Sequence, residues 1–381
     1  MHNWNHQEET QDEFEFGPLH QREPTPSSPS ESNSGTLGGT RIRPKICMSD
    51  RDWGDVQAIC KQLGIPARRL DFSRHYWNQV FEVMLQEYEH GRTPNPDITC
   101  NREIKFGKLI EWCNGNGGLG KDRHKSHPNS DSPEQQPELG WDYLATGHYA
   151  RVERDPETGR AKLMRALDSN KDQTYYLSEL SEQVLRNVIF PLARYDKPTV
   201  KRMAMETGVQ QLKNSAMKKE SMGICFVGQR RRFGEFLQEY LESKPGPVKI
   251  NGADGPVIGK HRGLFRYTVG QASGVTYGPE NQNERLFSSG LVVESWHWIA
   301  GAPPKKLLQL QQDRFMASDE GFPFSAQIRH RQKPQPCTIE LIRNHSDQVS
   351  NLAPAQSYAV RFKDTQRAIA PGQTTLKPYF G

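Results

Sequence analysis

Residues 91–106, GRTPNPDITCNREIKF, are the most informative stretch of this 381-residue chain. Pro94 and Pro96 stiffen a loop, and a helix is expected to begin within a few residues of Asp97. Cys100 then lies in the first helical turn, where unpaired N–H groups and the helix dipole favour a thiolate. Asp97, one turn earlier, is placed to move a proton or to hold a polar base. A structural interpretation stays open, with Asp97 as an N-cap and Cys100 as a buried core thiol.

The sequence around this stretch predicts an α/β domain. Residues 77–88 place apolar side chains at i, i+3, i+4, i+7, i+8 and i+11, which is typical of a core-facing helix ending at Gly91. A shorter stripe predicts a helix that ends at Gly64. Residues 143–146 predict a short buried strand, and residues 199–207 predict another helix. Helices that alternate with short strands indicate a doubly wound sheet.

Composition limits the function classes. The chain carries 50 Lys and Arg against 45 Asp and Glu, but residues 1–40 hold one basic and seven acidic side chains, so the remainder is basic. This charge is compatible with a phosphate-rich partner. Residues 1–42 and 114–139 have almost no aliphatic side chains and are expected to be disordered. No apolar run is long enough for a membrane span, so no membrane partner is expected.

The six cysteines are too few and too scattered for a disulfide scaffold, and no pair has CxxC spacing, so no metal site is expected. Cys225 lies in KKESMGICFVG, residues 218–228, and three arginines follow at 230–232. The basic flanks make Cys225 a candidate thiol of low pKa. The alternative is a core cysteine in a strand with a solvated basic flank.

Two further segments carry polar groups. In residues 146–151, TGHYAR, Gly147 follows the predicted strand, where ligands bind in open α/β sheets, whereas a lone histidine such as His148 is more often a structural hydrogen bonder. Lys171-Asp172-Gln173 precedes an apolar run and is typical of a surface turn. Beyond residue 228, short β-type runs at 291–293, 326–328, 338–342 and 358–362 predict a small β domain or barrel.

Six collinear segments together resemble the tRNA-specific 2-thiouridylase family, and KKESMGICF resembles its eukaryotic mitochondrial branch. The resemblance runs from about Cys47 to Gln373. The segments are TPNPDITCNREIKFG, ATGHYARV, NKDQTYYLSEL, KKESMGICFVG, GKHRGLFRYTVGQ and QRAIAPGQ.

The resemblance implies an ATP-dependent transfer of persulfide sulfur to C2 of the wobble uridine (U34) of mitochondrial tRNAs, the activity of a tRNA-5-taurinomethyluridine 2-sulfurtransferase. ATP, with Mg²⁺, adenylates the C2 oxygen. Cys225 matches the persulfide carrier and Cys100 its partner thiol, ending in a Cys100–Cys225 disulfide. Asp97 matches the general acid/base. The implied partners are tRNAs of the Lys, Glu and Gln type and a sulfur donor such as a cysteine desulfurase or a sulfur-relay protein, and the implied location is the mitochondrion.

The family's ligand contacts carry over residue by residue. Gly147 matches a position that binds ATP. The positions that match tRNA contacts are Asn95, Pro96, His148, Lys171, Asp172, Gln173, Arg329, His330 and Gln373.

The resemblance also implies the architecture. It predicts a doubly wound domain like the adenine-nucleotide alpha hydrolases (PP-loop type), incomplete at its N-terminus, a small central domain and a C-terminal β-barrel. The expected boundaries are an acidic tail at 1–42, the α/β catalytic domain at 43–227 with its insertion at 114–139, a central tRNA-binding domain at 228–285, and a truncated barrel at 286–381.

The departures concern ATP. The family opens with a strand and an SGGVDS-type loop that holds phosphates on backbone N–H groups. SGTLGGT at 34–40 is Gly-rich, but no apolar strand precedes it and it lacks the Asp-Ser pair. We therefore expect very weak ATP binding by this chain. Two interpretations stay open: a sulfurtransferase whose start is altered by a gene-model or splice artefact or supplied otherwise, and a catalytically silent tRNA-binding remnant.

Overall fold

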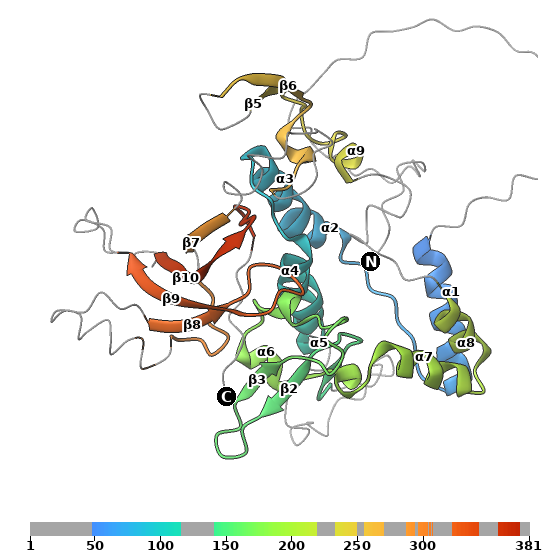
Figure 1. Cartoon of the computed structure of the whole chain (residues 1–381). Coiled ribbons are helices and arrows are strands. Elements are labelled where there is room, and N and C mark those ends of the chain that lie inside the picture. Colours follow the sequence, from blue (N-terminus) through green and yellow to red (C-terminus); the bar gives the residue numbers. More distant parts are fainter. Residues whose placement is uncertain are drawn as a thin grey trace, which may run out of the picture.

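The computed structural model describes residues 48–115, 141–218, 233–249, 255–269, 287–293, 296–303, 305, 307, 322–342 and 357–373. A column of helices, α2 to α5, runs through the middle of the molecule (Figure 1). A four-stranded antiparallel sheet lies on one side of this column, and α1, α7 and α8 lie on the other. The predicted tail at 1–42 lies outside the described residues, as does most of the predicted insertion at 114–139.

Helix α1 (Met48–Leu63) is the first described element. It ends at Gly64, whose φ of +66° suits a glycine at a helix C-terminus, so the predicted stop is confirmed. α1 packs beside α8 (Gln210–Met217), where Lys218 forms ion pairs with Asp52 and Asp55.

The first part of the column is continuous from residue 73 to residue 89. It consists of α2 (Ser73–Tyr76), a π-helical turn η1 (Trp77–Phe81) and α3 (Glu82–Glu89). The predicted stop at Gly91 is confirmed by its φ of +72°. The predicted apolar stripe forms a core with α9 (Phe233–Leu237), because burying these side chains removes a large apolar area from water. The buried members include Tyr76, Val80, Phe81, Met84, Tyr88, Phe236 and Leu237.

The second part of the column carries the central stretch of the sequence. It consists of α4 (Pro96–Cys100), a π-helix η2 (Asn101–Lys108) and α5 (Leu109–Gly115). A π-helix bonds residue i to i+5, is rare, and often occurs at functional sites. A Cβ at Gly107 would lie 2.7 Å from the carbonyl oxygen of Arg102, five residues earlier, so η2 needs glycine there.

The described α/β sheet is small. β1 (Leu144–Ala145) pairs in parallel with β4 (Val188–Ile189), as expected of a doubly wound domain. The strand predicted to be buried is not: Leu144 is half-buried and Ala145 is exposed, because within the described ranges β1 has one neighbouring strand.

The rest of this domain surrounds that pair. β2 (Arg151–Arg154) and β3 (Ala161–Met164) form an antiparallel hairpin. The helices are η3 (Thr174–Leu177), α6 (Glu182–Arg186), η4 (Pro191–Arg194) and α7 (Lys197–Glu206). α7 begins two residues before its predicted start, since the Asp196 side chain caps it by accepting the Thr199 N–H at 2.8 Å.

The remaining elements are β-rich, as predicted. β5 (Gly246–Lys249) and β6 (Val257–His261) form a hairpin, followed by η5 (Leu264–Arg266). The strands β7 (Phe287–Val293), β8 (Phe322–Ala326), β9 (Gln335–Ile342) and β10 (Ser357–Arg367) form the four-stranded sheet, in the order β7-β10-β9-β8.

The strand predicted at 326–328 is wrong by several residues, since β8 ends at Ala326. The next two residues also take part in local side-chain bonds. The Gln327 amide donates to the Arg329 carbonyl at 2.9 Å, and the Ile328 N–H donates to the Gln332 side chain at 2.9 Å.

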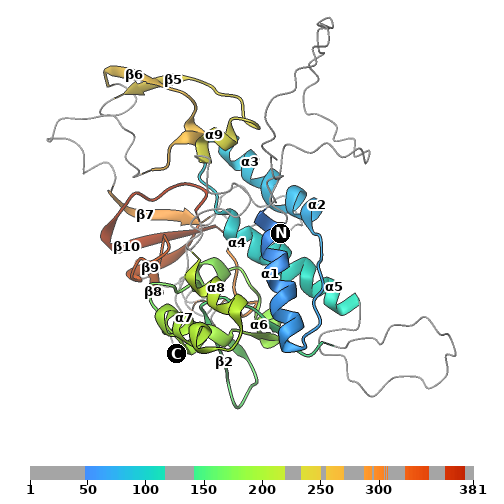
Figure 2. The same ribbon diagram turned by 90° about the vertical axis from the view of Figure 1, so that its right-hand side faces the viewer.

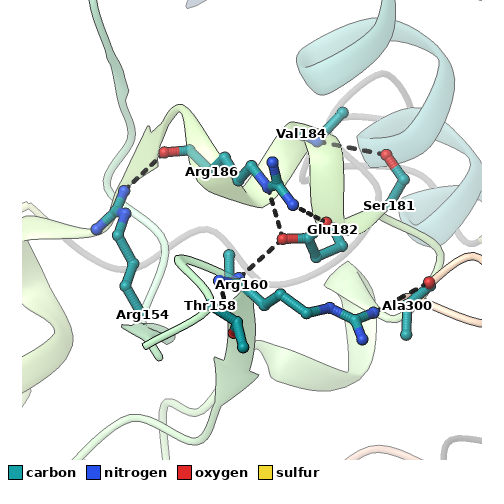
Figure 3. Close-up of polar contacts among 9 residues, drawn as sticks. Arg154, Thr158, Arg160, Ser181, Glu182, Val184, Arg186 and Ala300 are labelled. Atoms are coloured by element: carbon teal, nitrogen blue, oxygen red, sulfur yellow. Dashed lines mark hydrogen bonds and ion pairs between the residues drawn. The ribbon is translucent and has the colours of Figure 1, made fainter. Parts of the chain in front are cut away.

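Polar contacts join the α/β domain to the β-rich part of the chain. The Arg160 guanidinium donates to the Ala300 carbonyl at 3.2 Å (Figure 3), and the Glu182 N–H donates to the Ile299 carbonyl at 2.7 Å. The sheet β7–β10 stays beside α4 when the molecule is turned by 90° (Figure 2). None of the helices within the described ranges has both the length and the apolar character that a membrane crossing requires.

Candidate functional site

The N-terminus of α4 carries most of the candidate catalytic residues. Asn95 is the N-cap residue, and its carbonyl accepts the Ile98 N–H at 3.2 Å. Pro96 occupies the first helical position, where its fixed φ fits the helix and its missing N–H costs nothing. The predicted helix start near Asp97 is therefore confirmed, and the alternative with Asp97 as the N-cap is wrong.

Cys100 closes α4 and points into the apolar core. Its side chain is 3% exposed and belongs to the cluster that includes Tyr76, Met84 and Ile104. Burial of this thiol agrees with the structural interpretation, and its catalytic role stays a prediction. Cys225, its expected partner, lies outside the described residues.

Asp97 is half-buried three residues before Cys100. Burial raises the pKa of the Asp97 carboxyl, and the Lys105 ammonium acts in the opposite direction. Its carboxylate has no hydrogen-bond or ion-pair partner among the described residues. A carboxyl group with a raised pKa and no partner is suited to proton transfer.

Tyr176, on η3, is a neighbour of Asp97. Burial raises the pKa of the Tyr176 hydroxyl, and the negative charge of Asp97 adds to this increase. The Tyr176 carbonyl accepts the side-chain amide of Asn101 at 2.8 Å, which ties η3 to the start of η2. The sequence predicted no role for Tyr176, whose only signal was its place beside the KDQ triplet.

The turn after β1 forms a second part of the site. Gly147 is exposed, and nothing lies within 4 Å of the position that a Cβ would take. His148 is half-buried against Phe106, with ring centroids 5.5 Å apart, and its Nδ1 lies 2.8 Å from the Thr146 hydroxyl. The expected structural hydrogen bond of this histidine is therefore confirmed.

Burial, together with the smaller effect of the positive charge of Lys105, lowers the pKa of His148 to about 4. The imidazole is therefore neutral at pH 7. A neutral ring that packs on aromatic side chains is suited to stacking on a base or to hydrogen bonding, not to pairing with a phosphate charge.

Lys105 connects these two parts. It lies on η2 and is half-buried, and its charge acts on both Asp97 and His148. Its ammonium has no ion-pair partner among the residues that the structure describes. Lys105 carried no signal in the sequence beyond its place in the helix that follows Asp97.

Lys171 ends a turn, as predicted, closed by its N–H to the Asp168 carbonyl at 3.1 Å, and the Lys171-Asp172-Gln173 triplet is half-buried. The Asp172 carboxylate accepts the Ala166 N–H at 3.1 Å. Gln173 pairs twice with Tyr149, since its side-chain oxygen accepts the Tyr149 N–H at 2.9 Å and its N–H donates to the Tyr149 carbonyl at 2.8 Å. These bonds hold the segment against the α/β core.

The β-rich domain holds three of the predicted residues, and two of them bond to this region. His330 lies 2.8 Å from the Asp172 carbonyl through Nε2 and packs on Tyr176, with ring centroids 4.7 Å apart. The Gln373 side-chain amide donates to the Thr93 carbonyl at 2.8 Å. Arg329 instead donates to the Arg367 carbonyl within its own domain.

A metal ion and a nucleotide make different demands on these residues. No group of three His, Cys, Asp or Glu side chains that could hold a metal ion occurs in the described part of the chain. For an adenine nucleotide, the open space at Gly147, on the carboxyl side of a parallel strand, fits close approach of a ligand to the backbone.

Family models match almost the whole chain in the expected order. The tRNA methyl transferase HUP domain matches residues 36–122 and 132–229. The tRNA methyl transferase PRC-barrel domain matches residues 234–294, and the aminomethyltransferase beta-barrel domain matches residues 288–376. The predicted order of an α/β domain, a small domain and a C-terminal β-barrel is confirmed.

Three relatives, each described as tRNA-specific 2-thiouridylase MnmA, illustrate the similarity. The protein of Limosilactobacillus reuteri is 35% identical over 355 residues, which covers 87% of this chain and 80% of the relative. Those of Idiomarina loihiensis and Levilactobacillus brevis are 34% and 36% identical over 358 and 350 residues, with 87% of this chain and 81% and 80% of the relatives covered. The chain therefore belongs to the tRNA-specific 2-thiouridylase family.

Proposed function

We propose that this chain is a tRNA sulfurtransferase that replaces the C2 oxygen of a uridine with sulfur. The observation that carries the proposal is the start of α4, where a half-buried Asp97 of raised pKa lies one turn before Cys100. The relatives that share this chain's domain order are tRNA-specific 2-thiouridylases, which supports uridine in tRNA as the substrate.

In this proposal ATP supplies the activation, by adenylating the C2 oxygen so that it can leave. Gly147 offers open backbone at the edge of β1 and β4 for the nucleotide. Neutral His148 stacks on or bonds a nucleobase, and Lys105 supplies positive charge between this turn and Asp97.

Asp97 and the two cysteines carry the sulfur step. Asp97 takes and returns the proton of the uridine base. The terminal sulfur of a Cys225 persulfide attacks C2, and the C2–O bond breaks. The Cys100 thiolate then attacks Sγ of Cys225, which breaks the bond to the transferred sulfur. The two cysteines end as a disulfide, which balances the reduction of the persulfide sulfur, and an external thiol restores them.

We further propose the wobble uridine of mitochondrial tRNAs as the target, and a cysteine desulfurase or sulfur-relay protein as the donor. The resemblance of KKESMGICF to the mitochondrial branch supports this assignment. Fractionation of cells that express the tagged chain tests the location, and enrichment outside mitochondria would contradict it.

A second candidate is a protein that binds tRNA without thiolating it. The observation that favours it is the burial of Cys100 in the apolar core, where attack on a partner cysteine requires the surrounding side chains to move. This protein would keep the basic surface and the tRNA contacts while transferring no sulfur.

One experiment separates the two. The purified chain is incubated with a wobble-uridine tRNA, ATP, Mg²⁺, cysteine and a cysteine desulfurase, and 2-thiouridine is measured by mass spectrometry. Because ATP binding is expected to be very weak, thiolation is expected only at high ATP concentration, with its loss in Cys225→Ser and a trapped Cys225 persulfide in Cys100→Ser. Cys60→Ser is the matched control, since Cys60 is a free cysteine on α1, outside the site. A persulfide on another cysteine would contradict the assignment, and tRNA binding without thiolation would support the second candidate.

A further inference from the structure

The backbone just before α4 is bonded to the C-terminal domain. The Thr93 N–H donates to the Pro371 carbonyl at 2.7 Å, and the Thr93 carbonyl accepts the Gln373 side-chain amide at 2.8 Å. Both backbone polar groups of Thr93 are thus bonded to residues about 280 positions away in the chain. The two bonds lie on either side of Gly372.

Gly372 lies where the backbone of the C-terminal domain comes closest to the segment before α4. Its φ is +86°, a conformation that other residues adopt at a cost. A Cβ there would lie 3.0 Å from Cβ of Arg92 and 3.1 Å from the backbone nitrogen of Thr93. Glycine therefore allows the two backbones to approach each other. The turn is closed by the bond from the Gln373 N–H to the Ala370 carbonyl, at 3.3 Å, and Ala370 is buried.

No side-chain cap holds the helix start itself. The Asn95 side chain makes no cap hydrogen bond, and Pro94 and Pro96 have no N–H to donate. The two bonds at Thr93, four residues before Asp97, therefore constrain the backbone that leads into α4. On the other side of Asp97, Tyr176 is packed against His330, which comes from the same domain as Gln373.

We propose that Pro371, Gly372 and Gln373 form a clamp that positions the start of α4, so that the C-terminal domain sets the placement of Asp97 as well as contributing tRNA contacts. Pro371 and Gln373 hold the two backbone groups of Thr93, and Gly372 makes the approach possible. The kinetic part of this inference rests on the proposed thiolation, and the structural part does not.

The test compares Gly372→Ala with Gly159→Ala. Gly159 lies between β2 and β3, also has a positive φ, of +67°, and has nothing within 4 Å of its Cβ position, so it controls for backbone strain without the close contact. Amide hydrogen exchange is measured at Thr93 by fragmentation mass spectrometry. The prolines at 94 and 96 simplify the assignment, because they contribute no amides.

Gly372→Ala should speed exchange at Thr93 about tenfold or more, while Gly159→Ala leaves it unchanged. At saturating tRNA, Gly372→Ala should slow single-turnover thiolation by about tenfold or more, since small displacements of a catalytic group are costly. The tRNA Kd should stay within about twofold of that of the native chain, because the clamp acts on α4 and not on the phosphates.

Unchanged exchange at Thr93 in Gly372→Ala would overturn the clamp. An unchanged rate with a weaker tRNA Kd would show a tRNA contact in its place, and would overturn the positioning role. Gln373→Glu, which keeps the side-chain length and removes the donated hydrogen bond, should also slow the saturated rate. A native chain that thiolates no tRNA would refute the proposed function, while exchange at Thr93 would still decide whether the clamp exists.

Discussion

The carboxyl groups of Glu182 and Asp97 lie in the same domain, and their pKa values are shifted in opposite directions. The Glu182 carboxylate accepts hydrogen bonds from the Arg186 guanidinium at 2.7 and 3.0 Å and from the Ala161 N–H at 2.9 Å (Figure 3). The hydrogen bond from Arg186 is the main reason that the pKa of Glu182 is lowered. Asp97 has no such partner among the described residues, and its burial raises the pKa. The comparison separates a carboxylate that holds the fold from one that remains available for chemistry.

The largest expected effect is on activity at Asp97. Asp97→Asn should slow single-turnover thiolation about 100-fold or more, because an amide cannot exchange the proton. Stability should not fall at pH 7. A raised folded-state pKa means that ionised Asp97 disfavours folding, and this penalty appears as pH rises above the ordinary carboxyl pKa. Denaturant unfolding at pH 7 and pH 4 measures it, and clear destabilisation at pH 7 would assign Asp97 a structural role.

Glu182→Ala should have the opposite effect on the protein: stability should fall and activity should be kept. It leaves the buried Ala161 N–H without an acceptor, which should cost about 1–3 kcal/mol of unfolding free energy. The part of this loss that comes from the ionised carboxylate should be present above the ordinary carboxyl pKa and vanish as pH falls through the lowered folded-state pKa. Urea unfolding as a function of pH tests this. The saturated thiolation rate should be unchanged, and a large loss of rate would break the comparison.

The pH dependence of a Lys105 variant tests whether the pKa of Asp97 matters for the reaction. Lys105→Met removes the charge that lowers the pKa of both Asp97 and His148, so both pKa values should rise. The acid limb of the thiolation rate should move to higher pH, with several-fold slower turnover at its acid end. Lys108→Met is the control, since Lys108 forms an ion pair with Glu111 at 2.7 Å. Equal shifts in both variants would contradict a specific role for Lys105.

The smallest expected effect compares two helix caps. The Ser181 side chain caps α6 by accepting the Val184 N–H at 3.3 Å (Figure 3), and Ser181→Ala should cost about 1 kcal/mol. The Asn95 side chain makes no cap bond, so Asn95→Ala should cost less than about half of that. Urea unfolding measures both. Equal costs would indicate that the start of α4 is stabilised like an ordinary helix.

Local chemistry made much of the fold predictable. The glycines at 64 and 91 and the proline at 96 fix conformations that depend on few neighbours, and the helix ends and the start of α4 follow from them. The helix at 77–88 was predictable too, because the periodic spacing of its apolar side chains, which form a buried cluster, can be read from the local sequence. The bond between Thr93 and Gln373 was not predictable, because it joins positions far apart in the sequence. Nor was the end of β8, where the side chains of Gln327 and Gln332 bond to backbone groups a few residues away.

The π-helix η2 has a consequence for how related sequences compare. Two turns of an α-helix hold about 7 residues, whereas i→i+5 bonding adds a residue to a turn, so the eight steps from Asp97 to Lys105 still bring the two side chains into electrostatic contact. Deleting one residue between 101 and 104 would let the segment wind as an ordinary α-helix, in which the seven remaining steps from Asp97 again make about two turns. A one-residue alignment gap at this point therefore marks a relative in which the lysine can keep its place beside the aspartate without a π-helix.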